Sequence, residues 1–323
     1  MGIHDAFLSF IFSLAAIIVM IMTFVESMHV AEAQIILQIQ TFLGLGLRIP
    51  MTIVSLFASE AFVIAIIPVV YWCVNRKKGA ELGLLVLAST FINLWLKQIF
   101  GWPRPFDIIP SVGLASESSY GMPSGHSQLS VVFSAYIIQF LPKKWRPFML
   151  IGFPLLIGFS RIYLGVHFLT DVLGGYLAGT IFFLLYKLGE PAIEKMLQKA
   201  DLRVRVILAA AISFLMNLIL PKETMISGAF LGAALGFTFA AHGLSFEEND
   251  KLKIKVSRYL VGLATTGIVY IVLKMASTPI NSLLGNNQEN LLRFVRYTLV
   301  GGWVSFGVPF LFLKVGLAHR TSE

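Results

Sequence analysis

The chain has 323 residues, of which 57% are hydrophobic and only 13% are charged, and its mean hydropathy is +0.80. This composition excludes a water-soluble globular domain and requires a lipid bilayer as the solvent. The net charge of +8 does not indicate a nucleic-acid partner, because the basic residues lie in short connections between apolar segments.

The apolar segments predict an all-α polytopic membrane protein with about ten transmembrane helices. Each segment is continuous and is roughly long enough to cross a hydrocarbon core about 30 Å thick, and none alternates with the period of a strand. The expected spans are residues 8–26, 52–74, 81–100, 126–141, 147–164, 168–188, 204–220, 225–243, 258–276 and 292–315.

The start of the chain has no basic region or cleavage site before its first apolar run, so we expect that run to be retained as a span. The mixed polar and apolar segment 28–41 fits a helix lying in the membrane interface better than a crossing helix. The single cysteine, Cys73, has no partner with which to form a disulfide within the chain.

Four basic clusters predict the orientation of the chain in the membrane. With ten spans they all fall on one side, which the positive-inside rule makes cytoplasmic, and both termini are then cytoplasmic. A polar stretch at 190–202 further predicts a boundary between a six-span core, residues 1–190, and a four-span extension, residues 191–323. The clusters are Arg76, Lys77 and Lys78; Lys143, Lys144 and Arg146; Lys187, Lys195, Lys199, Arg203 and Arg205; and Lys251, Lys253, Lys255 and Arg258.

Polar residues from distant parts of the chain are expected on the outward side, where intramembrane charges usually mark function. Lys97, Arg104 and Arg161 are candidate donors to an anion, because fixed cations stabilise the charge that spreads over a phosphoryl group in transfer. Ser124 and Gly125 precede a span and can add backbone N–H groups and a hydroxyl at a helix N-terminus. Together they predict a phosphate-binding site.

His167 and Asp171 are four residues apart at the start of a helix, which places them on one face. An aspartate that accepts a hydrogen bond from one ring nitrogen leaves the other free to attack phosphorus. His126 is then the candidate general acid, and later the base that activates water. This arrangement needs no metal and no cofactor. Glu60 could touch substrate or form a structural hydrogen bond, and we leave it outside the catalytic set.

These residues resemble the three signature motifs of the type 2 phosphatidic acid phosphatase superfamily. Lys97 is followed after six residues by Arg104-Pro105; Pro123 to His126 read Pro-Ser-Gly-His; and Ser160-Arg161 precede His167 and Asp171 at the family spacing. The resemblance covers residues 50–190. It implies a six-helix core, metal-independent hydrolysis through phosphohistidine, and the residue roles given above.

We therefore expect an integral membrane phosphatase acting on a lipid phosphate or diphosphate, in the bacterial inner membrane with its site facing outward. The resemblance makes undecaprenyl diphosphate, phosphatidate, phosphatidylglycerol phosphate and phosphorylated sphingoid bases the candidate substrates. A lipid phosphotransferase with the same site and a lipid or anion transporter are the alternatives, and the oligomeric state stays open. Vanadate should inhibit the enzyme, whereas a chelator should not.

Small residues spaced four apart predict close helix packing rather than chemistry. One set is Gly228, Gly232 and Gly236, and the other is Gly175 with Gly179.

Overall fold

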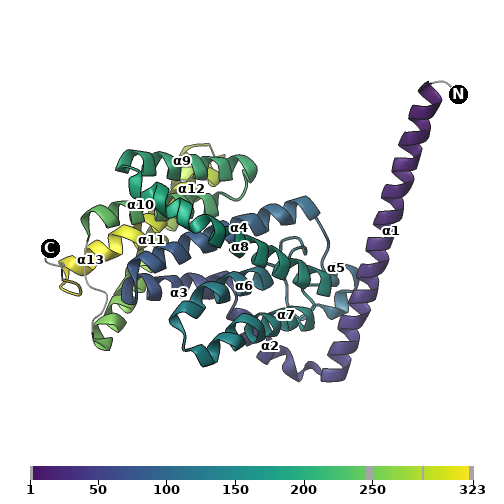
Figure 1. The fold of residues 1–323 in the computed structure, drawn as a ribbon, viewed down its shortest axis with the longest axis horizontal. Helices are drawn as coiled ribbons and strands as arrows, with labels where there is room; N and C mark the ends of the chain where they lie inside the picture. The colour runs from purple at the N-terminus through teal and green to yellow at the C-terminus, as the bar shows by residue number, and fades with distance from the viewer. Residues whose placement is uncertain (1–2, 245–250, 286, 320–323) are drawn as a thin grey trace.

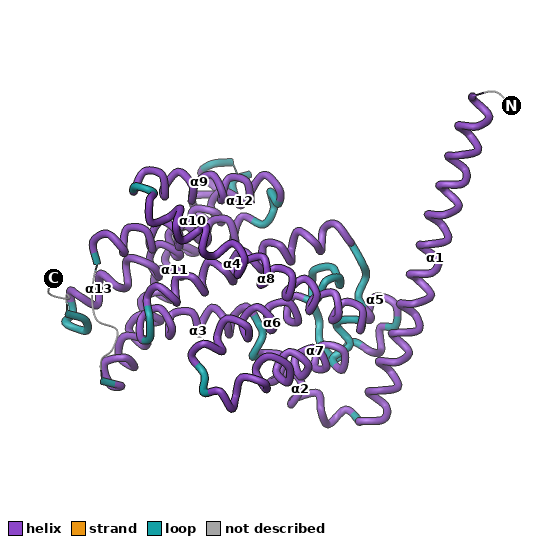
Figure 2. The backbone as a smooth tube through the Cα atoms, viewed as in Figure 1, coloured by secondary structure: helices purple, strands orange, loops and turns teal. Residues whose placement is uncertain are grey.

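The computed structural model describes residues 3–244, 251–285 and 287–319, and the part of the chain described is helical with no strand (Figure 2). The element order is α1 (Ile3–Leu43), α2 (Arg48–Leu56), α3 (Glu60–Cys73), α4 (Arg76–Phe100), α5 (Pro105–Ile108), α6 (Gly125–Ile137), α7 (Phe153–Tyr163), α8 (Leu169–Lys199), α9 (Leu202–Ile219), α10 (Thr224–Gly243), α11 (Leu252–Leu283), α12 (Glu289–Gly302) and α13 (Val308–Lys314).

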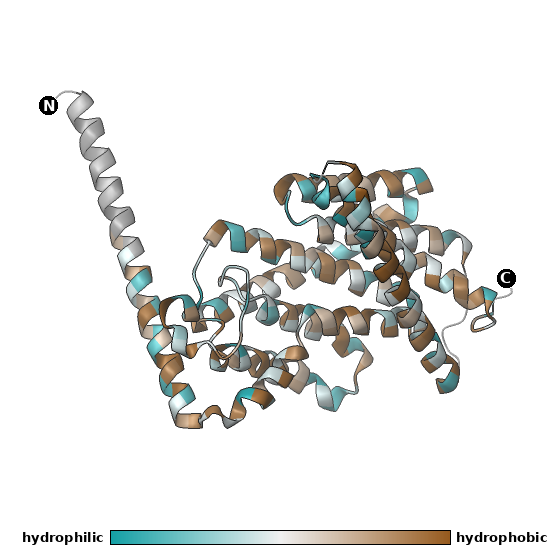
Figure 3. Ribbon diagram, turned by 180° about the vertical axis from the view of Figure 1, so that it is seen from behind, coloured by the Kyte–Doolittle hydropathy of each residue, from teal (hydrophilic) through white to brown (hydrophobic). Residues whose placement is uncertain are grey.

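Among the described residues, six helical segments are long and apolar enough to cross a bilayer. A seventh is possible if the bent pair Thr23–Leu43 and Leu45–Leu56, which meet at 95°, counts as one span. Hydrophobic residues occur along all the long helices (Figure 3), and many of their large side chains are exposed, as contact with lipid requires. The chain is therefore an all-α integral membrane protein. The six segments are 76–108, 169–199, 202–219, 224–243, 252–283 and 289–314.

The segment expected to be one span at 52–74 is divided into α2 and α3, which corrects that prediction. Ser59 ends the break in an extended conformation and its hydroxyl accepts a hydrogen bond from Phe62 N at 3.2 Å. A serine in this geometry is a favoured N-cap, so it starts a new helix. The spans expected at 126–141 and 147–164 correspond to the short helices α6 and α7.

The expected first span and the expected interfacial helix form one continuous helix, α1, because no glycine or proline interrupts residues 3–43. This helix passes across one end of the bundle beside α5, and its N-terminal half projects away from the body (Figure 1). Its C-terminal half contacts α5, α7 and the single turn Pro110–Val112.

Helix α6 lies at the centre of the core, packed against α4, α7 and α8. The close approach of α6 to α8 depends on two glycines. A Cβ atom at Gly175 would lie 2.5 Å from Ser124 O, and one at Gly179 would lie 2.7 Å from Gln128 O. The predicted close packing at these glycines is confirmed.

The extension packs on the core through α10 against α4 and α11 against α3. Within it, α10 and α12 approach each other most closely at the predicted glycines. A Cβ atom at Gly232 would lie 2.0 Å from Thr298 O, and one at Gly228 would lie 2.4 Å from Phe294 O. This packing prediction is also confirmed.

Basic residues at the start of α4 contact α8 and the residue that follows α10, at the end of the bundle opposite α5. Lys77 at the start of α4 pairs with Glu194 near the end of α8, and Arg76 donates to Leu244 O beyond α10. The expected linker at 190–202 is helical as far as Lys199, because it continues α8.

Candidate active site

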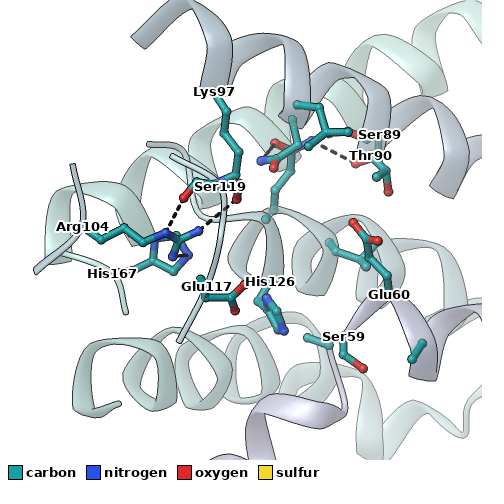
Figure 4. Close-up of a pocket in the computed structure, with 17 residues that line it drawn as sticks. Ser59, Glu60, Ser89, Thr90, Lys97, Arg104, Glu117, Ser119, His126 and His167 are labelled. Atoms are coloured by element: carbon teal, nitrogen blue, oxygen red, sulfur yellow. Dashed lines mark hydrogen bonds between the residues drawn. The ribbon is translucent and has the colours of Figure 1, made fainter. Parts of the chain in front are cut away.

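A cavity of about 360 Å³ lies between α3, α4, α6 and the loops that follow α5 and α7 (Figure 4). It receives side chains from segments that are far apart in the sequence, including both histidines singled out above. Its polar lining consists of Ser59, Glu60, Ser89, Thr90, Asn93, Lys97, Arg104, Glu117, Ser119, His126, Gln128 and His167.

His167 sits in the loop between α7 and α8 and is only 2% exposed. Its Nδ1 lies 3.2 Å from Asp171 Oδ2, and its Nε2 lies 3.3 Å from Arg104 Nη1. A guanidinium can only donate, so Nε2 is the acceptor in this contact and Nδ1 carries the proton that is donated to Asp171. The lone pair of Nε2 therefore points toward Arg104. Arg104 and His167 both line the cavity.

The protonation of His167 follows from its surroundings. Burial, and then the positive charges of Arg104, Arg161 and Lys97, hold the pKa of His167 well below its usual range. The imidazole is consequently neutral near pH 7, which is the form that has a free lone pair.

Asp171 ties the His167 loop to α6. It is fully buried in the first turn of α8, where its Oδ2 also accepts from Phe168 N at 3.1 Å. Its backbone oxygen accepts from Ser124 N at 2.9 Å. The starts of α6 and α8, about 45 residues apart in the chain, are thus fixed to each other.

Lys97 and Arg104 are held by carbonyl groups of the loop between α5 and α6, and Arg104 also by one in the loop between α7 and α8. Lys97 Nζ donates to Tyr120 O and, at 3.2 Å, to Gly121 O. Arg104 donates to Ser119 O at 2.5 Å from Nε and to Val166 O at 2.7 Å from Nη1. The two cations enter the cavity side by side (Figure 4).

Arg161 is held by side chains rather than by backbone carbonyl groups. Its guanidinium forms an ion pair with Glu117 and donates to Ser55 Oγ at 2.7 Å. Glu117 lines the cavity, whereas Arg161 lies directly behind it.

Some residues at the start of α6 line the cavity, and another caps the helix. Gly125 and His126 line the cavity. Ser124 is fully buried as the N-cap, where its hydroxyl accepts from Ser127 N at 3.4 Å and from Ser127 Oγ at 3.0 Å. The Ser124 hydroxyl is thus engaged within the first turn of α6.

The structure adds residues that the motifs did not indicate. Asn93 donates to Gln128 Oε1 at 2.9 Å, and Gln128 donates to Ser89 O at 2.8 Å, which gives the inner wall of the cavity a polar network. Glu117, which lines the cavity and pairs with Arg161, is a further residue outside the motifs. Buried amides in otherwise apolar helices are the sequence signal that could have identified Asn93 and Gln128.

No group of three or more histidine, cysteine, aspartate or glutamate side chains arranged to hold a metal ion occurs within the described residues. At the cavity, the neutral imidazole of His167, with its tautomer fixed by Asp171, lies beside the cations described above.

Comparison with known proteins gives matches on both halves of the chain. The family model of the PAP2 superfamily matches residues 78–193, and that of the PAP2 superfamily phosphatase, transmembrane extension, matches residues 224–320. The first match contains every motif residue described above.

Individual relatives are lipid phosphatases by name. Phosphatidylglycerophosphatase B of Bacillus subtilis is 36% identical over 135 residues, which cover 38% of this chain and 64% of that protein. Sphingosine-1-phosphate phosphatase 1 of Mus musculus is 22% identical over 302 residues, which cover 80% of this chain and 70% of the relative. For sphingosine-1-phosphate phosphatase 2 of the same species, the alignment reaches only 38% of the relative's length.

A solved structure also matches, the PAP2 type phosphatidylglycerolphosphate phosphatase from Bacillus subtilis. It is 30% identical, the match covers 52% of this chain and 87% of that chain, and the TM-score is 0.43.

Proposed function

The chain belongs to the PAP2 superfamily, and on that premise we propose that it is a phosphatase that hydrolyses a phosphate or diphosphate monoester of a membrane lipid. The observation that supports this most directly is the geometry of His167, whose Nδ1 faces Asp171 and whose Nε2 faces Arg104 at the cavity. A neutral imidazole in this setting is an activated nucleophile.

In the first step, His167 Nε2 attacks phosphorus and the bond from phosphorus to the lipid oxygen breaks. Lys97, Arg104 and Arg161, with the backbone N–H of Gly125, stabilise the charge on the phosphoryl oxygens. His126 donates a proton to the departing oxygen, so the lipid leaves as an alcohol, or as a monophosphate if the substrate is a diphosphate.

In the second step, water attacks the phosphohistidine and the bond from phosphorus to nitrogen breaks. His126, now unprotonated, accepts the proton of the water. Asp171 keeps its hydrogen bond to Nδ1 throughout and stabilises the positive charge on the ring of the intermediate. Inorganic phosphate leaves, and both histidines return to their starting states without a metal ion.

The named relatives support a lipid substrate. Their names cover phosphatidylglycerophosphate, sphingosine 1-phosphate and undecaprenyl diphosphate, and the PAP2 superfamily match on this chain contains all of its motif residues. We place the site at the outward face of a bacterial inner membrane, since the basic clusters lie at the opposite end of the bundle. The core of residues 1–190 carries the reaction in this proposal, and residues 191–323 form the extension.

A phosphotransferase would use the same first step and pass the phosphoryl group to another acceptor. Release of inorganic phosphate separates hydrolysis from transfer. A transporter would return the lipid phosphate unchanged and would leave no phosphoenzyme.

The two histidines can be tested separately with an aryl phosphate, whose phenolate leaves without needing a proton. His126→Ala should then still phosphorylate His167 but accumulate the intermediate, because the base for the second step is missing. His167→Ala should form no phosphoenzyme and lose activity by at least about a thousandfold. The phosphoenzyme is detected as acid-labile label after reaction with ³²P-labelled substrate.

His242→Ala is the matched control, since His242 is exposed near the end of α10, away from the cavity, and should behave as the wild type. Incubation with EDTA should leave phosphate release unchanged, and vanadate should inhibit it by binding at His167. Cleavage of lipid phosphate by His167→Ala at the wild-type rate would disprove the mechanism.

A further inference from the structure

Helix α1 buries several polar side chains against the protein, whereas some of its large apolar side chains are exposed. His29, Glu32 and Gln40 are 2%, 9% and 4% exposed, whereas Phe24 and Phe42 on the other side are 68% and 88% exposed. Burying polar side chains costs free energy unless they are hydrogen-bonded. Glu32 and Gln40 have hydrogen-bond partners, and those of Glu32 lie beside the nucleophile.

Glu32 binds the first turn of α8. One carboxylate oxygen accepts from Thr170 N at 2.9 Å and the other accepts from Thr170 Oγ1 at 2.8 Å. Helix α8 has a phenylalanine, Phe168, at its N-cap, and this side chain has no oxygen to accept from the free N–H groups of the first turn. Glu32 supplies that oxygen, and its negative charge lies at the positive end of the helix.

His29 holds the residue next to the nucleophile. Its ring stacks on Phe168 with centroids 4.5 Å apart and planes 5° apart, and it meets the ring of Trp102 edge-on at 5.0 Å. Phe168 follows His167 directly, and Thr170 precedes Asp171 directly. Two contacts from α1 thus fall between the two members of the catalytic pair.

A third contact fixes the C-terminal part of α1. Gln40 Nε2 donates to Val112 O and to Tyr163 O, both at 2.8 Å. The contacts of Gln40 fix the C-terminal part of α1 to the body of the protein. They therefore also fix the position from which α1 contacts Phe168 and Thr170.

We propose that Glu32 and His29 are positioning residues that hold the turn from His167 to Asp171 so that His167 Nε2 faces the cavity. This inference rests on the proposed function. Both residues precede the segments matched by the family models, which begin at residue 78. An N-terminal helix outside the matched segments therefore takes part in setting the geometry of the reaction.

The test compares Glu32→Ala with Glu26→Ala, a control on the same helix whose side chain is exposed. Since small displacements of a reacting group slow chemistry strongly, Glu32→Ala should lower kcat by about tenfold or more while KM stays within about twofold. Glu32→Gln should recover most of kcat, because its amide oxygen still accepts from Thr170 N. Glu26→Ala should match the wild type.

Amide hydrogen exchange over residues 166–172 provides a readout that does not need activity. Exchange should become faster in Glu32→Ala and stay unchanged in Glu26→Ala. If Glu32→Ala fails to accumulate in the membrane, Thr170→Ala, which removes only the hydroxyl contact, should lower kcat by about threefold.

Equal kcat values in Glu32→Ala and Glu26→Ala, or unchanged exchange over residues 166–172, would overturn the inference. A fall in kcat that Glu32→Gln does not reverse would also overturn it, because it would indicate a need for the charge rather than for the hydrogen bond. Failure of the proposed function would appear differently, as a wild-type protein that releases no phosphate from any lipid, and the exchange measurement would still test the contact.

Discussion

The cations around the cavity already have partners in the ligand-free protein, so substrate has to compete for them. Lys97 and Arg104 donate to backbone carbonyls, which are neutral. Arg161 is different, because its partner Glu117 is an anion like the substrate. If Arg161 binds phosphate as proposed, the phosphate must share it with this carboxylate or displace it, so we expect Glu117 to weaken phosphate binding.

Glu117→Gln should accordingly bind vanadate more tightly, by roughly threefold to tenfold, because the competing charge is gone. The same change should lower the stability of the protein by about 1–3 kcal/mol, since the ion pair with the buried Arg161 is lost. Vanadate inhibition constants and thermal unfolding of the purified protein measure the two effects.

Glu60→Gln is the matched control. Glu60 lines the same cavity, but the bonds of Arg161 go to Ser55 and Glu117. Equal gains in vanadate affinity in both variants would mean that general charge in the cavity, rather than contact with Arg161, sets the affinity.

Two pairs of helices pack so closely that glycine is needed at the points where their backbones touch. Gly175 and Gly179 bring α8 against α6, and Gly228 and Gly232 bring α10 against α12. Helices in lipid gain little from hydrophobic burial against each other, so close packing through small residues is a main source of their association. Close helix packing at glycines thus stabilises both the core and the extension.

Gly232→Ala should destabilise the protein by about 2 kcal/mol, because the new methyl group would overlap Thr298 O. Gly267→Ala in α11 should be neutral or slightly stabilising, since nothing lies within 4 Å of the added atom. Thermal unfolding in detergent compares the two variants. A similar unfolding temperature for both would contradict tight packing of α10 on α12.

At the scale of the whole molecule, the two ends of the bundle differ in chemistry. The cavity and α1 lie at one end, whereas the ion pair of Lys77 with Glu194 and the contact of Arg76 with Leu244 lie at the other. The cavity and these basic residues thus lie at opposite ends of the bundle, which is the arrangement that the proposed orientation requires.

Cysteine labelling tests this orientation in a Cys73→Ala background. Ser118→Cys, at an exposed position in the loop beside the cavity, should react with a membrane-impermeant maleimide in intact bacterial cells. Lys144→Cys, at an exposed position in the connection between α6 and α7, should react only after the membrane is opened. The reverse pattern would place the site on the cytoplasmic side.

Much of the site could be predicted because its residues are constrained by local chemistry. The spacing of His167 and Asp171 predicted that their side chains meet at a helix start. Their contact at 3.2 Å agrees with this, although His167 lies in the loop just before α8 rather than on the helix. The break between α2 and α3 escaped prediction, since a serine N-cap inside an apolar stretch gives only a weak signal. The catalytic and phosphate-binding roles of the site residues stay predictions.

Hydropathy and local spacing, which are properties of short segments, were enough to predict a membrane environment, a helical fold and the set of polar residues that share one end of the bundle. The contact of Glu32 with the start of α8 and the ion pair of Glu117 with Arg161 were found only in the folded protein. Their partners are 138 and 44 residues away in the chain. A hydrogen bond between such distant residues depends on how helices pack, and no local pattern encodes that packing.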